Sequence, residues 1–537
     1  VLQVSAKSVA ADGGFYPTEI AQSLRFNDND SAYLVGSTGT VTNGFTISMW
    51  VKRGNLTGTQ QALFSTNNAA DYTNQVEISF GTTDELFVYH NTGLDAIAAK
   101  SNGVLRDPSA WYHIVFSKPQ GSAGTLYING EAQTKQSLTT DNNILTYPPH
   151  IGRRASGLYF DGYLAEVHFT DGTAYTADDF GEFKSGVWVA KTPSVTYGTN
   201  GFYLDFADSG NIGNDAKGSN NWTPTNLAST DVMLDSPTNN FATLNPLFEA
   251  VATYYEGNLK VDTGTTGDSG VVSSILPTSG KWYWEVYYNS FGGNAAVVGL
   301  LPATSGYLYA DGYSYYSYNG NKSNLGTESA YGSSYTSGDI IGVAYDGDTG
   351  SLTFYKNGVS QGVAFTGLSG ELYPAIGDAT SVSITLTANF GQDSSFAGYK
   401  TPQGNTDANG IGDFYYAPPT GYLALCTANL PEPSISPLND ASPSDYFAPV
   451  IYTGDSTNSR AITTGLQSDF VWIKSRSNAR HHYLFDAVRG STLKLESNQT
   501  GAEVVGEQGK IDIFSAGPDG QPGTEDDIGS WNLQDFQ

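Results

Sequence analysis

Cysteine, basic residues and long apolar runs are all scarce in this sequence. Cys426 is the only cysteine among 537 residues, which excludes an internal disulfide framework and most metal sites built on thiolates. No apolar run reaches the length of about 18 residues that a membrane-spanning helix requires, so we expect no membrane span in this chain. Stability must therefore come from packing, with bound calcium as the one further source to consider.

Basic residues are outnumbered by acidic ones along the whole chain. Lys and Arg total 25 and Asp and Glu total 53, which gives a formal net charge of −28. A phosphate backbone would be repelled by such a protein, and an anionic membrane surface is disfavoured for the same reason. We therefore expect no nucleic-acid partner.

Glycine and aromatic residues are abundant instead. The sequence has 62 Gly, 35 Tyr and 26 Phe with only 15% charged residues, a profile typical of many short strands joined by turns. A chain of this length is too long for one core and predicts about three or four domains. The composition thus favours an all-β protein. The one early helix that we expect covers residues 1–11, and Val1 in place of Met leaves room for a removed leader or membrane helix.

Alternating apolar and polar residues begin near Ser23 and predict strands that bury one face. The ordered set includes Phe45-Thr-Ile-Ser-Met-Trp-Val, Trp111-Tyr-His-Ile-Val-Phe, an Asn129-Gly130 hairpin turn and Phe160-Asp-Gly-Tyr-Leu-Ala-Glu-Val. This order resembles a laminin G-like, concanavalin A-like jelly roll. The resemblance implies a two-sheet sandwich over residues 20–190.

A second jelly roll is predicted further along the chain. Lys281-Trp-Tyr-Trp-Glu is followed by Asp339-Ile-Ile-Gly-Val and by Phe354-Tyr-Lys-Asn-Gly, an order that resembles a SPRY domain. Between the two modules, Asn220-Asn-Trp-Thr-Pro-Thr-Asn and neighbouring runs resemble the connector of virion-associated phage proteins. Asp469-Phe-Val-Trp-Ile-Lys resembles a third segment of the same proteins.

The expected fold is all-β, with two tandem jelly-roll sandwiches, concanavalin A-like and SPRY-like, and a smaller β-rich C-terminal domain. The predicted divisions are an N-terminal helix or leader segment (1–19), the laminin G-like sandwich (20–190), an ordered connector (191–249), the SPRY-like sandwich (250–400), a linker (401–445), a small β domain (446–500) and a final segment (501–537).

That final segment carries the strongest signal for an ion. Asp519-Gly-Gln-Pro-Gly-Thr-Glu-Asp-Asp527 places four acids within a Gly-rich loop, and calcium takes about six to eight oxygen ligands in flexible geometry. The segment resembles the C-terminal end of a type II secretion major pseudopilin. The resemblance implies a structural calcium held by Asp519, Asp526 and Asp527. A solvated acidic turn is the alternative. For the polar run at residues 27–30 we predict a polar turn, and a second ion site is the alternative.

A tyrosine-rich run between core strands of the SPRY-like module is the candidate ligand-binding surface. Tyrosine offers a rigid apolar ring with a polar tip, which suits both sugar stacking and protein contacts. The SPRY resemblance implies that variable loops form the recognition surface here. The alternative is that the tyrosines fill the sheet. The candidates are Tyr307, Tyr309, Tyr313, Tyr315, Tyr316 and Tyr318.

Catalytic constellations are not recognisable in the sequence. A glycosidase needs two placed carboxyl groups, and Glu166 has no partner in a suitable motif. His481 and His482 lack a Glu-x-x-His or cysteine partner and are predicted to lie on a strand or turn surface. No Gly-rich phosphate loop opens a helix. We therefore expect no enzyme.

The predicted function is extracellular adhesion. Rigid sandwiches would present loop residues to a cell-surface glycan or protein receptor, on a phage tail fibre or a decorated virion, in contact with other copies or with virion proteins. The rival hypothesis is a pseudopilin-like filament subunit that carries inserted adhesin domains. A glycan-degrading enzyme and a fusion of unrelated sequences are further alternatives. Each of the first two readings places the protein outside the cell or on a virion surface.

Overall fold

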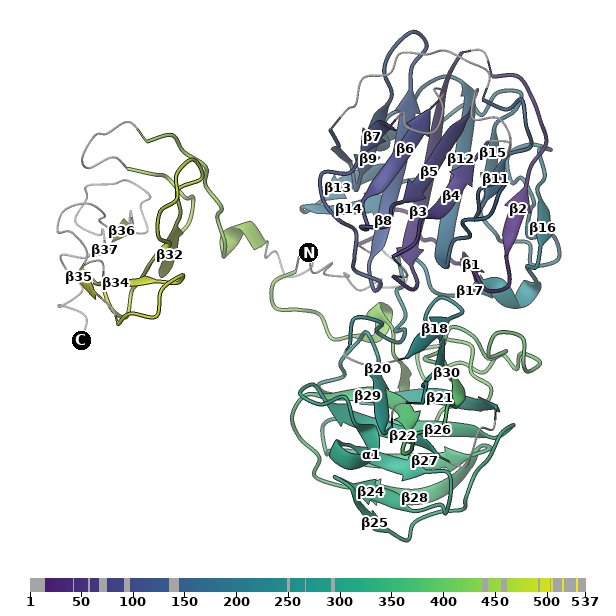
Figure 1. The fold of residues 1–537 in the computed structure, drawn as a ribbon, viewed down its shortest axis with the longest axis vertical. Helices are drawn as coiled ribbons and strands as arrows, with labels where there is room; N and C mark the ends of the chain where they lie inside the picture. Colours follow the sequence, from purple (N-terminus) through teal and green to yellow (C-terminus); the bar gives the residue numbers. More distant parts are fainter. Residues whose placement is uncertain are drawn as a thin grey trace. The chain divides into compact units, whose positions relative to one another are not determined.

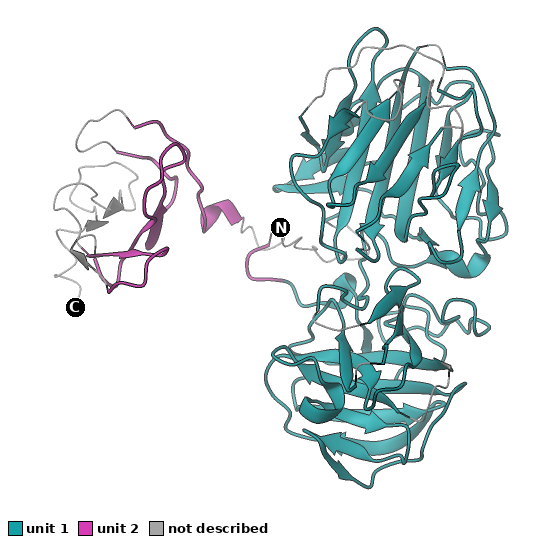
Figure 2. Ribbon diagram, in the orientation of Figure 1, with its two compact units in different colours: residues 1–432 teal, residues 433–537 magenta. Residues whose placement is uncertain are grey.

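The computed structural model describes most of the chain as two compact units. It describes residues 15–41, 43–56, 58–66, 75–90, 97–134, 144–248, 252–265, 267–290, 295–436, 443–454, 461–490 and 493–502, and three short strands beyond them. Figure 1 shows the fold, and Figure 2 colours the units, residues 1–432 and 433–537. The described part is nearly all-β, as predicted, and its helices are too short to cross a bilayer. The helix predicted at residues 1–11 lies outside the described residues.

The first sandwich consists of two antiparallel sheets that face each other. The eight-stranded sheet has the order β10-β9-β8-β3-β12-β1-β17, with β15 beside β12. Its strands are β1 (Ser23–Phe26), β3 (Gly44–Arg53), β8 (Trp111–Lys118), β9 (Thr125–Ile128), β10 (Glu131–Ala132), β12 (Gly162–Gly172), β15 (Phe202–Leu204) and β17 (Val232–Met233). The seven-stranded sheet has the order β16-β2-β11-β4-β5-β6-β7. Its strands are β2 (Tyr33–Val35), β4 (Gln61–Ser65), β5 (Val76–Phe80), β6 (Leu86–His90), β7 (Ile97–Lys100), β11 (His150–Ile151) and β16 (Thr223–Thr225).

The alternating pattern of the sequence explains the core between these sheets. Ile47 and Ile114 of one sheet share a buried cluster with Ile78 and Val88 of the other. Every second residue of a strand points to the same face, so each sheet contributes one apolar face to the core. A hairpin on the rim, β13 (Gly181–Lys184) with β14 (Val187–Ala190), completes the module.

Both predicted Asn-Gly hairpins are present. Asn129 and Gly130 have φ values of 48° and 80°, and Asn357 and Gly358 have 49° and 77°. Positive φ at both central positions is the geometry that matches a two-residue turn to the twist of the flanking strands. The prediction of these two turns from the residue pair alone is confirmed.

The predicted connector at residues 191–249 is ordered, but it is part of the first sandwich. It supplies β15 and β17 to one sheet and β16 to the other. Asp235 explains much of this docking, because its carboxylate accepts hydrogen bonds from the Lys52 ammonium at 2.6 Å and the Trp111 indole at 3.2 Å. The Pro-rich and Asn-rich composition predicted a connector and gave no sign of these three short strands.

The second sandwich also has two sheets. The eight-stranded sheet has the order β18-β19-β30-β21-β26-β27-β28, with β31 beside β21. Its strands are β18 (Thr253–Tyr255), β19 (Lys260–Asp262), β21 (Lys281–Ser290), β26 (Ile340–Asp346), β27 (Ser351–Lys356), β28 (Val359–Phe365), β30 (Thr385–Asn389) and β31 (Leu423–Ala424). The six-stranded sheet has the order β20-β29-β22-β23-β24-β25. Its strands are β20 (Ser269–Val272), β22 (Ala296–Pro302), β23 (Tyr313–Tyr316), β24 (Lys322–Asn324), β25 (Thr327–Ser329) and β29 (Leu372–Asp378), and the one-turn helix α1 spans Leu308–Asp311.

The prediction of a linker at residues 401–445 is wrong for most of that range. The segment up to residue 432 belongs to the first compact unit, and β31 pairs in parallel with β21. Phe414 and Cys426 are buried together with Tyr283 of β21. The carboxylate of Glu285 accepts backbone N–H groups from Tyr415 and Tyr416, both at 2.8 Å. Long-range hydrogen bonds therefore fix a segment whose local composition is typical of a loop.

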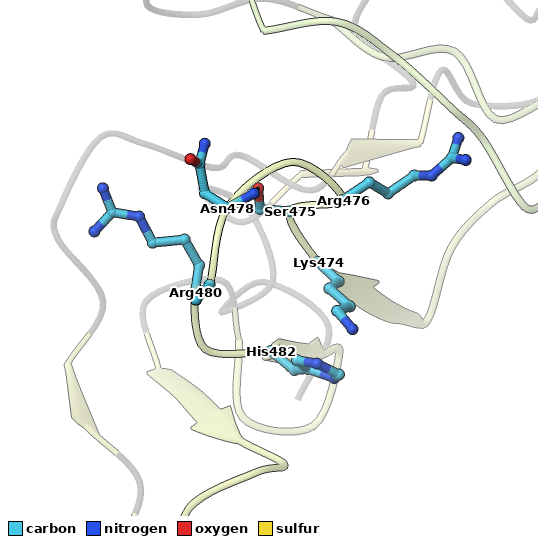
Figure 3. Close-up of a pocket in the computed structure, with 7 residues that line it drawn as sticks. Lys474, Ser475, Arg476, Asn478, Arg480 and His482 are labelled. Carbon is cyan, nitrogen blue, oxygen red and sulfur yellow. The ribbon is translucent and has the colours of Figure 1, made fainter.

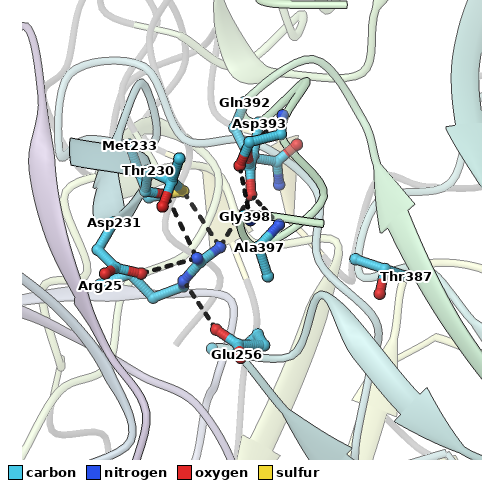
Figure 4. Close-up of polar contacts among 12 residues, drawn as sticks. Arg25, Thr230, Asp231, Met233, Glu256, Thr387, Gln392, Asp393, Ala397 and Gly398 are labelled. Atoms are coloured by element: carbon cyan, nitrogen blue, oxygen red, sulfur yellow. Dashed lines mark hydrogen bonds and ion pairs between the residues drawn. The ribbon is translucent and has the colours of Figure 1, made fainter. Parts of the chain in front are cut away.

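A buried arginine joins the two sandwiches. The Arg25 side chain on β1 forms ion pairs with Asp231 at 2.9 Å, Glu256 at 3.2 Å and Asp393 at 3.0 Å (Figure 4). Glu256 and Asp393 belong to the second module, and Arg25 is 1% exposed. Burial alone would lower the pKa of Arg25, but the three carboxylates raise it. The two modules are therefore held together by buried ion pairs, in which loss of one partner would leave an uncompensated buried charge.

The C-terminal unit contains a small antiparallel sheet. Its order is β32-β33-β34-β35, and β36 pairs with β37. The strands are β32 (Phe470–Ile473), β33 (Tyr483–Asp486), β34 (Leu493–Glu496), β35 (Val504–Val505), β36 (Phe514–Ser515) and β37 (Ile528–Gly529). Short 3-10 turns elsewhere are η1 (Ala177–Asp179), η2 (Ser229–Asp231), η3 (Thr427–Asn429) and η5 (Pro443–Asp445).

Candidate functional site

The tyrosine-rich run forms α1, strand β23 and the turn that follows them. Helix α1 begins after Tyr307, and its first backbone N–H groups, on Tyr309 and Ala310, donate to the Asp268 carboxylate at 3.1 and 2.8 Å. Strand β23 pairs with β22 on one side and β24 on the other. The run is thus a packed helix and strand, whereas the sequence predicted a variable loop.

Strand alternation divides the predicted tyrosines between two faces of the six-stranded sheet. Tyr315 is fully buried against Tyr335 and Phe354, and Tyr313 is half-buried against Phe365. Both belong to the core between the sheets. The prediction that Tyr315 contacts a ligand is therefore wrong, and Tyr313 is a core side chain with one edge accessible. Period-two alternation, applied within the run itself, would have separated these two residues from Tyr316.

The remaining tyrosines lie on the outer side of the sheet. Tyr316 contacts Tyr309 at a ring-centroid distance of 5.4 Å and Tyr318 at 6.1 Å. Tyr318 is 63% exposed, and Tyr309 and Tyr316 are half-buried. We call Tyr309, Tyr316 and Tyr318 the tyrosine face. Tyr307, just before α1, is 57% exposed as well.

Glu328 on β25 braces the tyrosine face. Its carboxylate accepts the hydroxyl of Tyr309 at 2.6 Å and the side-chain amides of Asn319 at 2.6 Å and Asn321 at 2.8 Å. The bond to Tyr309, followed by the two amides, lowers the pKa of Glu328. The same bond, with burial second, raises the pKa of Tyr309 to about 12. Glu328 therefore stays ionised and Tyr309 stays a hydroxyl donor at neutral pH.

This arrangement suits recognition by contact. Aromatic rings bury large apolar area at little cost in side-chain entropy, and their hydroxyls still form hydrogen bonds. Asn319 and Asn321 lie in the turn next to Tyr318 and add amide groups to the same surface. Sequence reasoning missed these two residues and Glu328, because their roles depend on the pairing of β23, β24 and β25.

Other predicted polar groups have structural partners. Glu166, at a bulge in β12, accepts the Tyr203 hydroxyl at 2.9 Å and 2.8 Å on its two oxygens. Asn27 donates to Asp30 at 2.8 Å across the polar turn between β1 and β2, and to Glu256 at 3.0 Å. His481 and His482 lie at the turn before β33, as predicted.

Metal ligation is not visible in the described part of the chain, where no group of three His, Cys, Asp or Glu side chains is arranged to hold an ion. The predicted calcium ligands Asp519, Asp526 and Asp527 lie outside the described residues. A polar hollow of about 500 Å³ in the first sandwich is lined by Asp171 and Asn200, among others. The Asn200 amide already donates to the Asp171 carboxylate at 2.7 Å. The hollow is therefore a junction of loops whose polar side chains bond to each other.

Three family profiles match separate parts of the chain. The concanavalin A-like lectin/glucanase superfamily matches residues 27–179, and the SPRY domain matches residues 281–393. Both predicted sandwich families are thereby confirmed. A domain of unknown function, DUF7483, matches residues 442–532. This last match runs across the division that the sequence predicted between residues 500 and 501.

Curated relatives and a solved structure match shorter stretches. A type II secretion system core protein G from Pectobacterium carotovorum is 79% identical over 28 residues, which are 5% of this chain and 18% of that protein. Ran-binding protein 9 of Danio rerio is 31% identical over 174 residues, 29% of this chain and 27% of that protein. The SPRY domain of human HERC1 is 25% identical, covers 27% of this chain and 96% of that domain, and has a TM-score of 0.25. The chain thus spans under a third of either relative.

Proposed function

We propose that this protein is a non-enzymatic adhesion protein that works outside the cell. In this proposal the second sandwich binds a carbohydrate or a protein on a cell surface through the tyrosine face, and the particle that carries it is a phage tail fibre or a decorated virion. A binding role is consistent with the two sandwich families that the chain matches.

The observation that carries the proposal is the tyrosine face, whose rings are ordered by packing and by the hydrogen bond from Tyr309 to Glu328. The ring of Tyr316, on a paired strand, contacts those of Tyr309, on a one-turn helix, and Tyr318, in a short turn. Glu328 fixes the hydroxyl of one ring and two neighbouring amides. A surface that is ordered before binding loses less entropy on contact with a partner. Exposed aromatic rings without such support would be ordinary surface residues.

The proposal also includes the class of partner. A net charge of −28 disfavours polyphosphates and favours a partner recognised by stacking and hydrogen bonds. Either a glycan or a protein loop offers these contacts.

A binding array tests the proposal. The full chain is screened on arrays of glycans and cell-surface proteins, together with the variant Tyr316→Ala/Tyr318→Ala. Each stacked ring contributes about 0.5–1.5 kcal/mol, so the double variant should weaken binding by about tenfold. Tyr446 is 61% exposed and lies in the other unit, and Tyr446→Ala is the matched control. Equal binding by parent and double variant would remove the tyrosine face as the site.

The non-enzymatic part of the proposal has its own test. The purified chain is incubated with a panel of polysaccharides and assayed for new reducing ends. We expect none to form. Turnover of any polysaccharide, lost in a Glu166→Gln variant, would assign the first sandwich a glycosidase role instead.

A second candidate function is supported by one observation. The 28-residue match at 79% identity to a type II secretion system core protein favours a filament subunit with inserted binding domains. Cryo-electron microscopy of the native particle separates the two functions. A capsid or tail location supports the virion proposal, and a helical filament supports the pilin-like one.

A further inference from the structure

A basic loop stands out in the C-terminal unit of this acidic chain. The loop, residues 474–482, connects β32 to β33 and carries Lys474, Arg476 and Arg480 with no Asp or Glu between them. Only 25 basic residues occur in the 537 of the chain, so three within seven positions is a strong local excess. Among the described residues, none of the three forms an ion pair.

The loop lies along a hollow whose lining offers hydrogen-bond donors. An open hollow of about 410 Å³ is lined by Lys474, Ser475, Arg476, Asn478, Ala479, Arg480 and His482. Figure 3 shows the loop as an arch, with Lys474 and His482 near each other at its base and the two arginines extending to either side. Ammonium and guanidinium groups donate hydrogen bonds and accept none. No carboxylate lines the pocket to compete for them.

An exposed tryptophan lies beside this pocket. The Trp472 indole N–H donates to Nδ1 of His482 at 3.3 Å, and the two ring centroids are 5.7 Å apart. Because an indole can only donate, Nδ1 of His482 accepts, which leaves its Nε2–H free to donate to a ligand. Trp472 is 59% exposed and Phe470, on the same face of β32, is 54% exposed. Apolar rings and cationic donors are therefore adjacent.

We propose that the basic loop and Trp472 form a binding site for an anionic polysaccharide. Carboxylate or sulfate groups on the sugar chain would accept from Lys474, Arg476 and Arg480, since guanidinium and ammonium groups form the strong charge-assisted bonds. The apolar face of a sugar ring would stack on Trp472. This site is separate from the tyrosine face and does not depend on the proposed function of that face.

The acidic charge of the whole chain favours a polysaccharide over a nucleic acid as the ligand of this loop. A duplex carries dense charge over a long rigid surface, and this chain, at −28 in total, would repel it. A flexible sugar chain with spaced anionic groups can reach the loop and avoid the acidic surface. The loop is thus suited to a polymer of modest charge density.

Binding of the full chain to immobilised chondroitin sulfate and polygalacturonate, with neutral dextran as reference, tests the proposal. The variant Lys474→Gln/Arg476→Gln/Arg480→Gln should lose affinity by at least about tenfold, because even one charge-assisted contact contributes on that scale. Affinity of the parent should fall as salt is raised. Trp472→Ala should weaken binding at constant net charge.

The matched control is Lys191→Gln/Lys217→Gln/Lys281→Gln, which removes the same charge from exposed positions of the first unit. Retained binding by this control, with loss in the loop variant, supports the site. Equal losses in both triple variants, no binding by the parent, or unchanged binding by the loop variant would each overturn it. Preference for double-stranded RNA or DNA over both polysaccharides would overturn it in favour of a nucleic-acid partner. Thermal melts verify that all variants are folded.

Discussion

The two sandwiches of residues 1–432 share an architecture but use different titratable groups to anchor a peripheral segment to a central strand. In the first, His113 of β8 is buried, and its Nδ1 accepts the Trp188 indole N–H at 3.0 Å. In the second, Glu285 of β21 is buried and accepts the backbone N–H groups of Tyr415 and Tyr416. Each group ties a peripheral segment to a central strand: the β14 strand in one module, the segment after the sandwich in the other.

The two anchors respond to pH in opposite directions. Burial, and to a lesser extent the charge of His168, lowers the pKa of His113 to about 3. Burial raises the pKa of Glu285 to about 7, and the hydrogen bonds from Tyr416, Tyr415 and others limit the rise. The same sheet architecture therefore does not determine how a module responds to acid. Which polar side chains the module buries decides it, and His113 and Glu285 are one contrasting pair.

The largest effect is expected from a substitution that removes the ion-pair link between the two modules. Arg25→Met leaves Glu256 and Asp393 buried without their cation, and breaking such a pair costs about 3–5 kcal/mol. We expect calorimetry to show a lower melting temperature and separate transitions for the two sandwiches. Arg106, whose side chain is largely exposed and pairs with Asp84, is the control, and Arg106→Gln should change stability by about 1 kcal/mol or less. An unchanged melt for Arg25→Met would contradict this role.

The next largest effect is expected when calcium is removed, and it should differ between the first unit and the C-terminal one. If Asp519, Asp526 and Asp527 hold calcium, an ion present at about 100 times its dissociation constant adds about 2.7 kcal/mol to the free energy of unfolding. A chelator should then lower the melting temperature of residues 433–537 and leave that of residues 1–432 unchanged. Asp526→Asn/Asp527→Asn should melt early with or without chelator. Identical melts of the parent in calcium and in excess chelator would count against the site.

Glu285 should make the protein less stable as the pH rises from 5 to 7. An unfolded glutamate has a pKa of about 4.3, so between that value and about 7 the folded state holds more protons. Stability from this group is full at low pH and is lost as the pH rises, by about 2 kcal/mol between pH 5 and pH 7. Glu285→Gln should lack this component. Denaturant unfolding of parent and variant at both pH values measures it, and parallel pH profiles would refute it.

Acid destabilisation of similar size should come from His113. An unfolded histidine binds a proton below about 6.5, whereas folded His113 stays neutral until about pH 3. The unfolded state therefore binds more protons in this window, and acidification from pH 7 to pH 5 lowers the free energy of unfolding by about 2 kcal/mol. The difference in stability between parent and His113→Gln should shrink on acidification. If it grows or stays constant, the buried neutral imidazole is not the source.

Local sequence signals predicted many strands of both sandwiches, and long-range contacts determine the elements that the sequence did not predict. The Asn129-Gly130 and Asn357-Gly358 turns follow from backbone preference, and the strands follow from alternation. The strand formed by residues 423–424 could not be predicted, because it depends on its pairing with β21. The docking of Tyr415 on Glu285 was equally hidden, since the two are far apart in the sequence.

The candidate site was predicted in part. The sequence directed attention to the correct segment, and Tyr309, Tyr316 and Tyr318 lie together on its outer face. Tyr315 is a core residue, which alternation within the run indicates. Glu328 gives no signal in the sequence, because its role appears only when β25 is paired beside β24.

Hydrogen–deuterium exchange of the full chain, with and without the receptor selected on the arrays, tests the central claim most directly. We expect slower exchange of backbone amides in residues 307–328, around the tyrosine face, and unchanged exchange in the first sandwich. Protection confined to residues 23–233, with none at residues 307–328, would contradict the claim that this protein binds its partner through the tyrosine face.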